Sequence, residues 1–192
     1  MRVHRIAFAV VAVIALLPFS AFATSFVVFP KAAQLPSPDG RFVVRDGEPS
    51  GTSPDFNGIS HSLWLVDQVT GHSRKLCDYL GLAAVAWSGN DFILVTQYVG
   101  RRTSRALVFS IATDADPVLL DEPTLTRLVP AELRPTLREN NRIFIEASGV
   151  EKDTLHLTVW GYGPHDANGF HWSCEYSLRD GVVSCTEQHA SH

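Results

Sequence analysis

The chain has 192 residues, of which 45% are hydrophobic and 19% are charged, and its formal net charge at pH 7 is −4. This length fits one domain with a sizeable core. The acidic balance argues against a nucleic acid partner, because phosphate binding draws on clusters of Lys and Arg.

The first 23 residues predict a cleavable signal peptide. Arg2 and Arg5 precede an apolar run over residues 6–17, and residues 21–23 read Ala-Phe-Ala, the small-residue pattern of a cleavage site. The run is too short to span a bilayer comfortably. We therefore expect one β-rich domain over residues 24–192, periplasmic or secreted, with no membrane attachment after cleavage. The alternative is an uncleaved N-terminal anchor.

The remaining sequence predicts an all-β fold. Its apolar segments are short, rich in Val, Ile, Leu, Phe and Trp, and separated by Gly, Pro, Asp and Asn. The predicted strands are residues 26–29, 42–45, 62–67, 73–77, 84–87, 92–97, 105–111, 118–120, 142–147, 154–160, 170–178 and 182–186. Residues 63–66, 92–95 and 106–109 are apolar on both faces, which is typical of strands in the middle of layered sheets.

Only the linker over residues 121–141 looks helical. Pro123, Pro130 and Pro135 divide it, and proline inside a helix removes a backbone donor. The pattern predicts one or two short helices, around residues 123–128 and 131–138. We expect this linker to cover a strand edge, since open edges invite association.

The chain also repeats itself weakly. Residues 37–44, SPDGRFVV, are echoed by residues 88–95, SGNDFILV, and each is followed by a strand, a polar turn and another strand. The offset is 51 residues for these motifs (88 − 37) and 43 for the strands that follow them at residues 62–67 and 105–110 (105 − 62), which is in the range of a propeller blade repeat.

These motifs carry a resemblance to a known family. SPDGRFVV followed by LWLVDQVTGHSRKL resembles the WD-type β-propeller repeat of exported bacterial proteins, well over residues 37–120 and poorly over residues 142–186. The resemblance implies about three blade-like antiparallel sheets. A closed propeller needs at least four blades, so a partial propeller or an open stacked sandwich is expected. The whole chain also resembles small exported bacterial proteins of unassigned function, which implies no activity.

The three cysteines predict one disulfide bond, because pairing is the default in an oxidising compartment. A hairpin register that places Tyr176 opposite Val183 also places Cys174 opposite Cys185 and keeps the apolar side chains on one face. A three-residue loop would slip this register by one residue. We predict a Cys174–Cys185 bond, with Cys77 as a buried thiol.

Common catalytic motifs are absent from the sequence: it has no Gly-x-Ser-x-Gly elbow, no His-Glu-x-x-His zinc helix and no phosphate-binding loop. The loop over residues 161–171 is richest in reactive side chains. His165, Asp166 and His171 could converge on a metal ion, with the amide of Asn168 beside them. The alternative is a long hairpin connection whose polar side chains bond to the backbone.

A second candidate is the basic pair Arg101 and Arg102, which lies with Arg105 beside Tyr98. Guanidinium groups suit carboxylates, so this loop could bind an acidic partner. The alternative is a solvated hairpin tip.

Two further predictions concern acidic residues and tryptophans. Asp39, Asp46 and Glu48 could supply an acidic pair for hydrolysis, although Ser-Pro-Asp-Gly is also explained as a turn. The tryptophans stand among apolar neighbours and are all predicted to lie in the core. They are Trp64, Trp87, Trp160 and Trp172.

The leading hypothesis is an exported, non-catalytic binding or inhibitory module with a protein partner in the periplasm or outside the cell. An immunity-type inhibitor is one form of it, with an acidic face over a basic active site. We expect no cofactor and no metal ion. The alternative is a small hydrolase with a site near His165, Asp166 and His171, and a third hypothesis is a structural envelope component.

Overall fold

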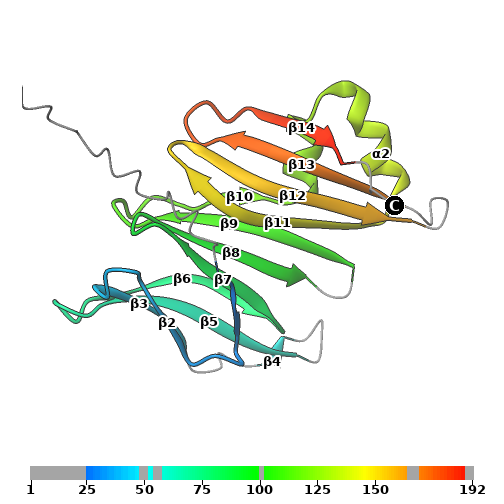
Figure 1. The fold of residues 1–192 in the computed structure, drawn as a ribbon. Coiled ribbons are helices and arrows are strands. Elements are labelled where there is room, and N and C mark those ends of the chain that lie inside the picture. Colours follow the sequence, from blue (N-terminus) through cyan, green and yellow to red (C-terminus); the bar gives the residue numbers. More distant parts are fainter. Residues whose placement is uncertain (1–24, 48–51, 54–57, 100–101, 164–168, 189–192) are drawn as a thin grey trace, which may run out of the picture.

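The fold is mostly β in the computed structural model, which describes residues 25–47, 52–53, 58–99, 102–163 and 169–188 (Figure 1). These residues form two open sheets and no closed propeller or barrel. The strands are β1 Val27–Phe29, β2 Gln34–Pro36, β3 Phe42–Asp46, β4 Thr52–Ser53, β5 Gly58–Asp67, β6 Ser73–Leu80, β7 Ala83–Ser88, β8 Phe92–Val99, β9 Thr103–Ser110, β10 Val118–Leu120, β11 Arg142–Glu151, β12 Thr154–Tyr162, β13 Phe170–Ser177 and β14 Val183–Glu187. The helical elements are α1 Glu122–Leu128, the 3-10 helix η1 Ala131–Leu133 and α2 Arg134–Glu139.

The five-stranded sheet is built from β2 to β6, in the order β2–β3–β5–β4 with β6 also beside β5. Its first hairpin depends on the Ser-Pro-Asp-Gly turn. The hydroxyl of Ser37 donates to Asp39 at 2.6 Å, and the N–H of Gly40 donates to the carbonyl of Ser37 at 2.9 Å. Gly40 has φ of +73°, a left-handed conformation that favours glycine. The turn prediction for this motif is confirmed.

The nine-stranded sheet has the order β1–β7–β8–β9–β11–β12–β13–β14, with β10 also beside β9. It consists of two antiparallel halves: β1 and β7 to β10 form the first, and β11 to β14 form the second. A single parallel bridge, Ile143 with Thr103, joins β11 to β9. Because this bridge joins the two strand groups into one sheet, the described residues form two sheets where about three were predicted.

Two serine hydroxyls explain how β11 is held against the first half. Ser104 accepts from the N–H of Ile145 at 2.8 Å and donates to the carbonyl of the same residue at 3.0 Å. Ser88 makes the same pair of bonds to Val150, at 2.8 and 3.1 Å. Each hydroxyl thus replaces a neighbouring strand as partner for a backbone amide group.

Two apolar cores lie on opposite faces of the first half. Strands β8 and β9 are buried on both faces, which confirms the prediction for residues 92–95 and 106–109. The same prediction is wrong for residues 63–66, because Trp64 and Val66 on the outer face of β5 are only half-buried. The first core joins this half to the five-stranded sheet, and includes Phe29, Val44, Leu63, Leu65, Val85, Ile93, Val95 and Leu107. The second core joins it to the second half and the helices, and includes Leu94, Val108, Leu125, Leu137, Ile145, Leu157 and Trp172.

The helices form where the prolines allow them to start. Asp121 caps α1 by accepting from the N–H of Thr124 at 2.9 Å, and Pro123 lies in the first turn, where no donor is needed. The buried Leu125 and Leu137 belong to the second core. The linker therefore packs its apolar side chains into the second core; its expected role in covering a strand edge stays a prediction. No helix in the described part of the chain is long and apolar enough to cross a membrane.

All twelve strands predicted from the sequence are present, with longer ends at β5, β6 and β11. Strands β2 and β4 were not predicted. Both are very short, and β2 contains Pro36 and is largely exposed. They lack the alternation that identifies a longer strand.

Candidate functional site

Most of the loop residues predicted to bind a ligand lie outside the described residues: Arg101, His165, Asp166 and Asn168. Of the others, Arg102 and His171 are both exposed. His171 pairs with Trp160 across β12 and β13 and alternates with the buried Phe170 and Trp172. It therefore faces away from the second core. No group of three or more His, Cys, Asp or Glu side chains that could hold a metal ion occurs among the described residues.

The proposed acidic pair is not assembled from its described members. Asp39 belongs to the turn, and hydrogen bonds from the Ser37 hydroxyl and the Arg41 N–H lower the pKa of its carboxyl group. Asp46 lies in a different network with His61 and Tyr79. Glu48 lies outside the described residues.

A polar network replaces the apolar core at one end of the layer between the sheets. Asp46 accepts from the hydroxyl of Tyr79 at 2.7 Å, and its other oxygen lies 3.1 Å from Nδ1 of His61. The two rings stack with centroids 5.3 Å apart. Burial, and then the bond to Asp46, raise the pKa of Tyr79, so the phenol stays protonated and keeps donating. A carboxylate bound to an imidazole can orient a general base, but among the described residues no hydroxyl or thiol hydrogen-bonds to His61.

A buried amide crosses between the sheets beside this network. Gln97 is only 3% exposed, and its Nε2 donates to the carbonyl of Asp78 at 3.0 Å and to Sγ of Cys77 at 3.1 Å. Its Oε1 accepts from Nε of Arg105 at 2.8 Å. Burial raises the pKa of Cys77 to about 11, so its thiol is neutral at physiological pH. Cys77 is free, as predicted, although it is half-buried and not fully buried.

Arg105 lies in a pocket of about 260 Å³ between the five-stranded sheet and strands β8 and β9. Its walls include the side chains or backbone of Tyr79, Leu80, Gln97 and Val99. We call this the Arg105 pocket. It combines one guanidinium group with apolar and aromatic walls.

A groove of about 830 Å³ lies where β2, the β7–β8 turn and the β11–β12 hairpin meet. Leu35, Trp87 and Val150 give it apolar walls, and Nε1 of Trp87 donates to the carbonyl of Leu35 at 3.3 Å. Glu151 and His156 also line it. Nδ1 of His156 lies 3.8 Å from a carboxylate oxygen of Glu175 on β13.

A row of stacked aromatic rings occupies the face of β11 and β12 that points away from the second core. Phe144 and Trp160 pair across the strands with ring centroids 4.1 Å apart. Tyr162 lies 6.3 Å from Trp160, and its ring is nearly parallel. The guanidinium of Arg142 lies 4.9 Å from the centre of the Tyr162 ring, and Nη1 donates to its hydroxyl at 3.0 Å. We call these four residues the aromatic row.

The prediction that all four tryptophans lie in the core is wrong for two of them. Trp87 and Trp172 are buried in the two cores, as expected. Trp64 and Trp160 are half-buried and belong to neither core. For Trp160 the signal was present in the sequence: Leu155, Leu157 and Val159 alternate on one face of the strand, which places Trp160 on the other.

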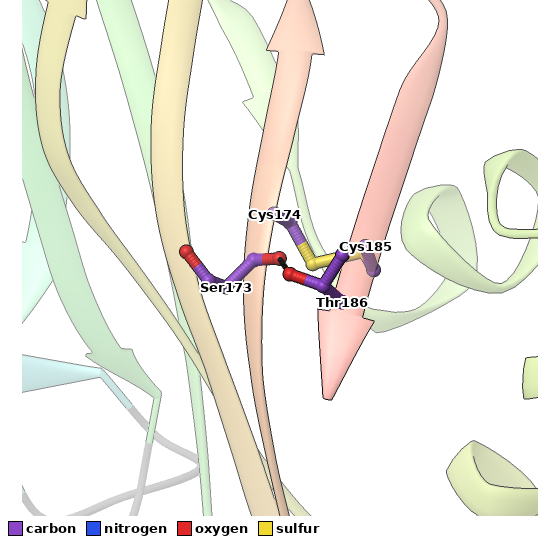
Figure 2. The surroundings of a disulfide bond; sticks show 4 residues. All are labelled: Ser173, Cys174, Cys185 and Thr186. Atoms are coloured by element: carbon purple, nitrogen blue, oxygen red, sulfur yellow. Dashed lines mark hydrogen bonds between the residues drawn. A yellow bond between two sulfur atoms is a disulfide. The ribbon is translucent and has the colours of Figure 1, made fainter. Parts of the chain in front are cut away.

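The predicted disulfide bond is present, as Figure 2 shows. Tyr176 lies opposite Val183 and Cys174 lies opposite Cys185, which is the predicted register. The two Cα atoms are 4.1 Å apart. Beside the bond, the Thr186 hydroxyl lies 3.4 Å from the Ser173 carbonyl. The bond ties β14, the last strand of the sheet, to β13.

The comparisons with known proteins add no relative. No family model matches the chain, and neither the curated proteins nor the solved structures contain a significant match. The resemblance to propeller repeats therefore stays a prediction from the sequence.

Proposed function

We propose that this protein is an exported, non-catalytic binding module that takes up a protein partner on the aromatic row. The observation that carries the proposal is the placement of the half-buried Trp160, Tyr162 and Arg142, beside the buried Phe144, on a sheet face outside the two core clusters. Side chains of this kind are enriched at the centres of protein interfaces. If these side chains served only to stabilise the fold, we would expect them on the face of β11 and β12 that packs into the second core.

The geometry of the row favours binding over a packing role. The rings are held by one another and by Arg142, so little side-chain entropy is lost when a partner covers them. Glu146 lies on the same face of β11, and Glu175 lies on the same face of β13. Glu146 is two residues from Phe144, whereas Glu175 pairs with His156, four residues from Trp160. Carboxylates on this face suit a partner with a basic surface, such as the active site of a toxin in the inhibitor form of the proposal.

The compartment is part of the same proposal. The signal-peptide pattern supports export to the periplasm or the outside of the cell. The Cys174–Cys185 bond supports it independently, because stable disulfides are typical of oxidising compartments.

The proposal also includes the arrangement of the sheets. The five-stranded sheet and the two halves of the nine-stranded sheet correspond to three blade-like units of an open arrangement.

The test is partner capture from a periplasmic extract with matched variants. Wild type, a Trp160→Ala/Tyr162→Ala variant and a Thr158→Ala/Ser173→Ala control on the same face would be compared after their thermal unfolding has been matched. We expect wild type and control to retain the same partner, and the aromatic variant to bind it at least tenfold more weakly. Equal retention by all three proteins would contradict the proposal.

The same preparation decides between binding and hydrolysis. A panel of ester, glycoside and peptide substrates would be tested with metal ions added or chelated. Turnover by wild type that is lost in a His171→Ala variant would replace the binding proposal with the hydrolase alternative.

A further inference from the structure

The Arg105 pocket has features of a site for a small anion. Nε of Arg105 is bound by Gln97 at 2.8 Å, while no carboxylate lies within ion-pair distance of the guanidinium among the described residues. Arg105 is half-buried as a residue and lines a pocket between the two sheets. A guanidinium group without a carboxylate partner has its two terminal nitrogens left for a ligand.

Gln97 fixes the direction of this guanidinium. Its amide is buried, and both ends are in use: Nε2 is bound to Cys77 and Asp78 of β6, and Oε1 is bound to Arg105. Because the amide is anchored to the opposite sheet, Arg105 is held before any ligand arrives. An anchored binding group loses less entropy on complex formation than a mobile one.

The charge around the pocket favours a ligand with a single negative charge. Asp78 is the one acidic residue in the described lining, and it is engaged by Lys75 at 2.7 Å and by the Ser62 hydroxyl at 2.6 Å. Outside the lining, the carboxyl of Asp121, which caps α1, also interacts electrostatically with Arg105. One guanidinium group remains in the lining. Its planar fork matches a carboxylate through two parallel hydrogen bonds.

The walls indicate the rest of the ligand. Leu80 and Val99 are apolar, and Tyr79 uses its hydroxyl on Asp46. A volume of about 260 Å³ is below the range of drug-sized ligand sites and suits a group of amino-acid size. We infer that the Arg105 pocket binds a monocarboxylate with a short apolar chain. This inference does not depend on the aromatic row.

The experiment measures binding of 4-methylpentanoate to the disulfide-bonded mature protein by NMR titration, with 4-methylpentanamide as the uncharged probe. We expect shifts at Leu80, Gln97 and Val99 with the acid and none with the amide. An Arg105→Gln variant should bind at least tenfold more weakly. The control Arg138→Gln removes the same charge from an exposed position of α2 and should leave binding unchanged.

Several outcomes would overturn the inference. They are equal shifts with acid and amide, equal weakening by both substitutions, or no binding by wild type. If Arg105→Gln fails to fold, the acid and amide titrations of wild type still decide. A tripeptide ending in Leu, compared with its C-terminal amide, identifies the source of the carboxylate: tighter binding than 4-methylpentanoate assigns the pocket to a chain terminus, and equal or weaker binding of the free tripeptide assigns it to a small acid.

Discussion

The first half of the nine-stranded sheet is held on its two faces in different ways. On one face, apolar side chains such as Leu63 and Ile93 pack between the sheets. On the other, apolar packing is joined by the hydroxyls of Ser88 and Ser104, which bind the backbone of β11. Burial is non-directional, whereas each serine binds both backbone groups of one residue. The first junction therefore supplies mainly stability, and the second also fixes the position of a strand.

Removing volume from the first junction should have the largest effect. Leu63 is fully buried, and Leu63→Ala should lower the free energy of unfolding by about 3 kcal/mol, because it removes apolar contact and leaves a cavity. Urea denaturation measures the change. Val69→Ala is the control, since Val69 is 79% exposed and should change stability by less than about 0.5 kcal/mol. Equal losses in both variants would contradict the role given to the first core.

The second largest loss of stability is expected from breaking the buried hydrogen bonds of the second junction. Ser104→Ala leaves the N–H and carbonyl of Ile145 without their hydroxyl partner in a buried position, which should cost about 2 kcal/mol. Amide hydrogen exchange at Ile145 should accelerate beyond the change in global stability. Ser173→Ala, an exposed substitution on β13, is the matched control. Wild-type protection at Ile145 in the Ser104 variant would show that the hydroxyl does not hold β11.

The second serine sharpens this comparison. Ser88 makes the same two bonds to Val150, but the site is only partly buried, so water can replace the hydroxyl. Ser88→Ala should therefore cost about 1 kcal/mol, which is less than Ser104→Ala. The two variants would be compared in one urea series. A reversed order would mean that burial does not set the cost of losing these bonds.

The smallest effect is expected at Cys77, beside Gln97 in the first junction. Cys77→Ser keeps an acceptor for the Gln97 amide and should change stability by less than about 1 kcal/mol. Since the pKa of Cys77 is raised to about 11, iodoacetamide at pH 8 should alkylate the folded protein much more slowly than the urea-unfolded chain. Mass spectrometry measures the rate of Cys77 alkylation. Equal rates in the two states would show that the thiol is not protected.

The alternation of apolar residues was enough to predict twelve of the fourteen described strands, and the same argument favoured the Cys174–Cys185 register. The hydrogen bonds between Ser104 and Ile145 could not be predicted, because a single serine that bonds to a distant strand produces no repeating pattern in the sequence. The Arg105 pocket was missed for a similar reason. Its hairpin was expected, but the pairing of Arg105 with Gln97 depends on a register that only the folded chain shows.

The N-terminal strands impose an order on assembly. Strand β1 pairs Val27 with Val85 of β7 in the nine-stranded sheet, while β2 pairs Leu35 with Val44 of β3 in the five-stranded sheet. Strand β2 can pair as soon as its neighbour is made, but β1 must wait until the whole five-stranded sheet and β7 have been synthesised. Its unpaired backbone stays exposed for that time. Among the described residues, the first strand to be synthesised cannot be the first to reach its place.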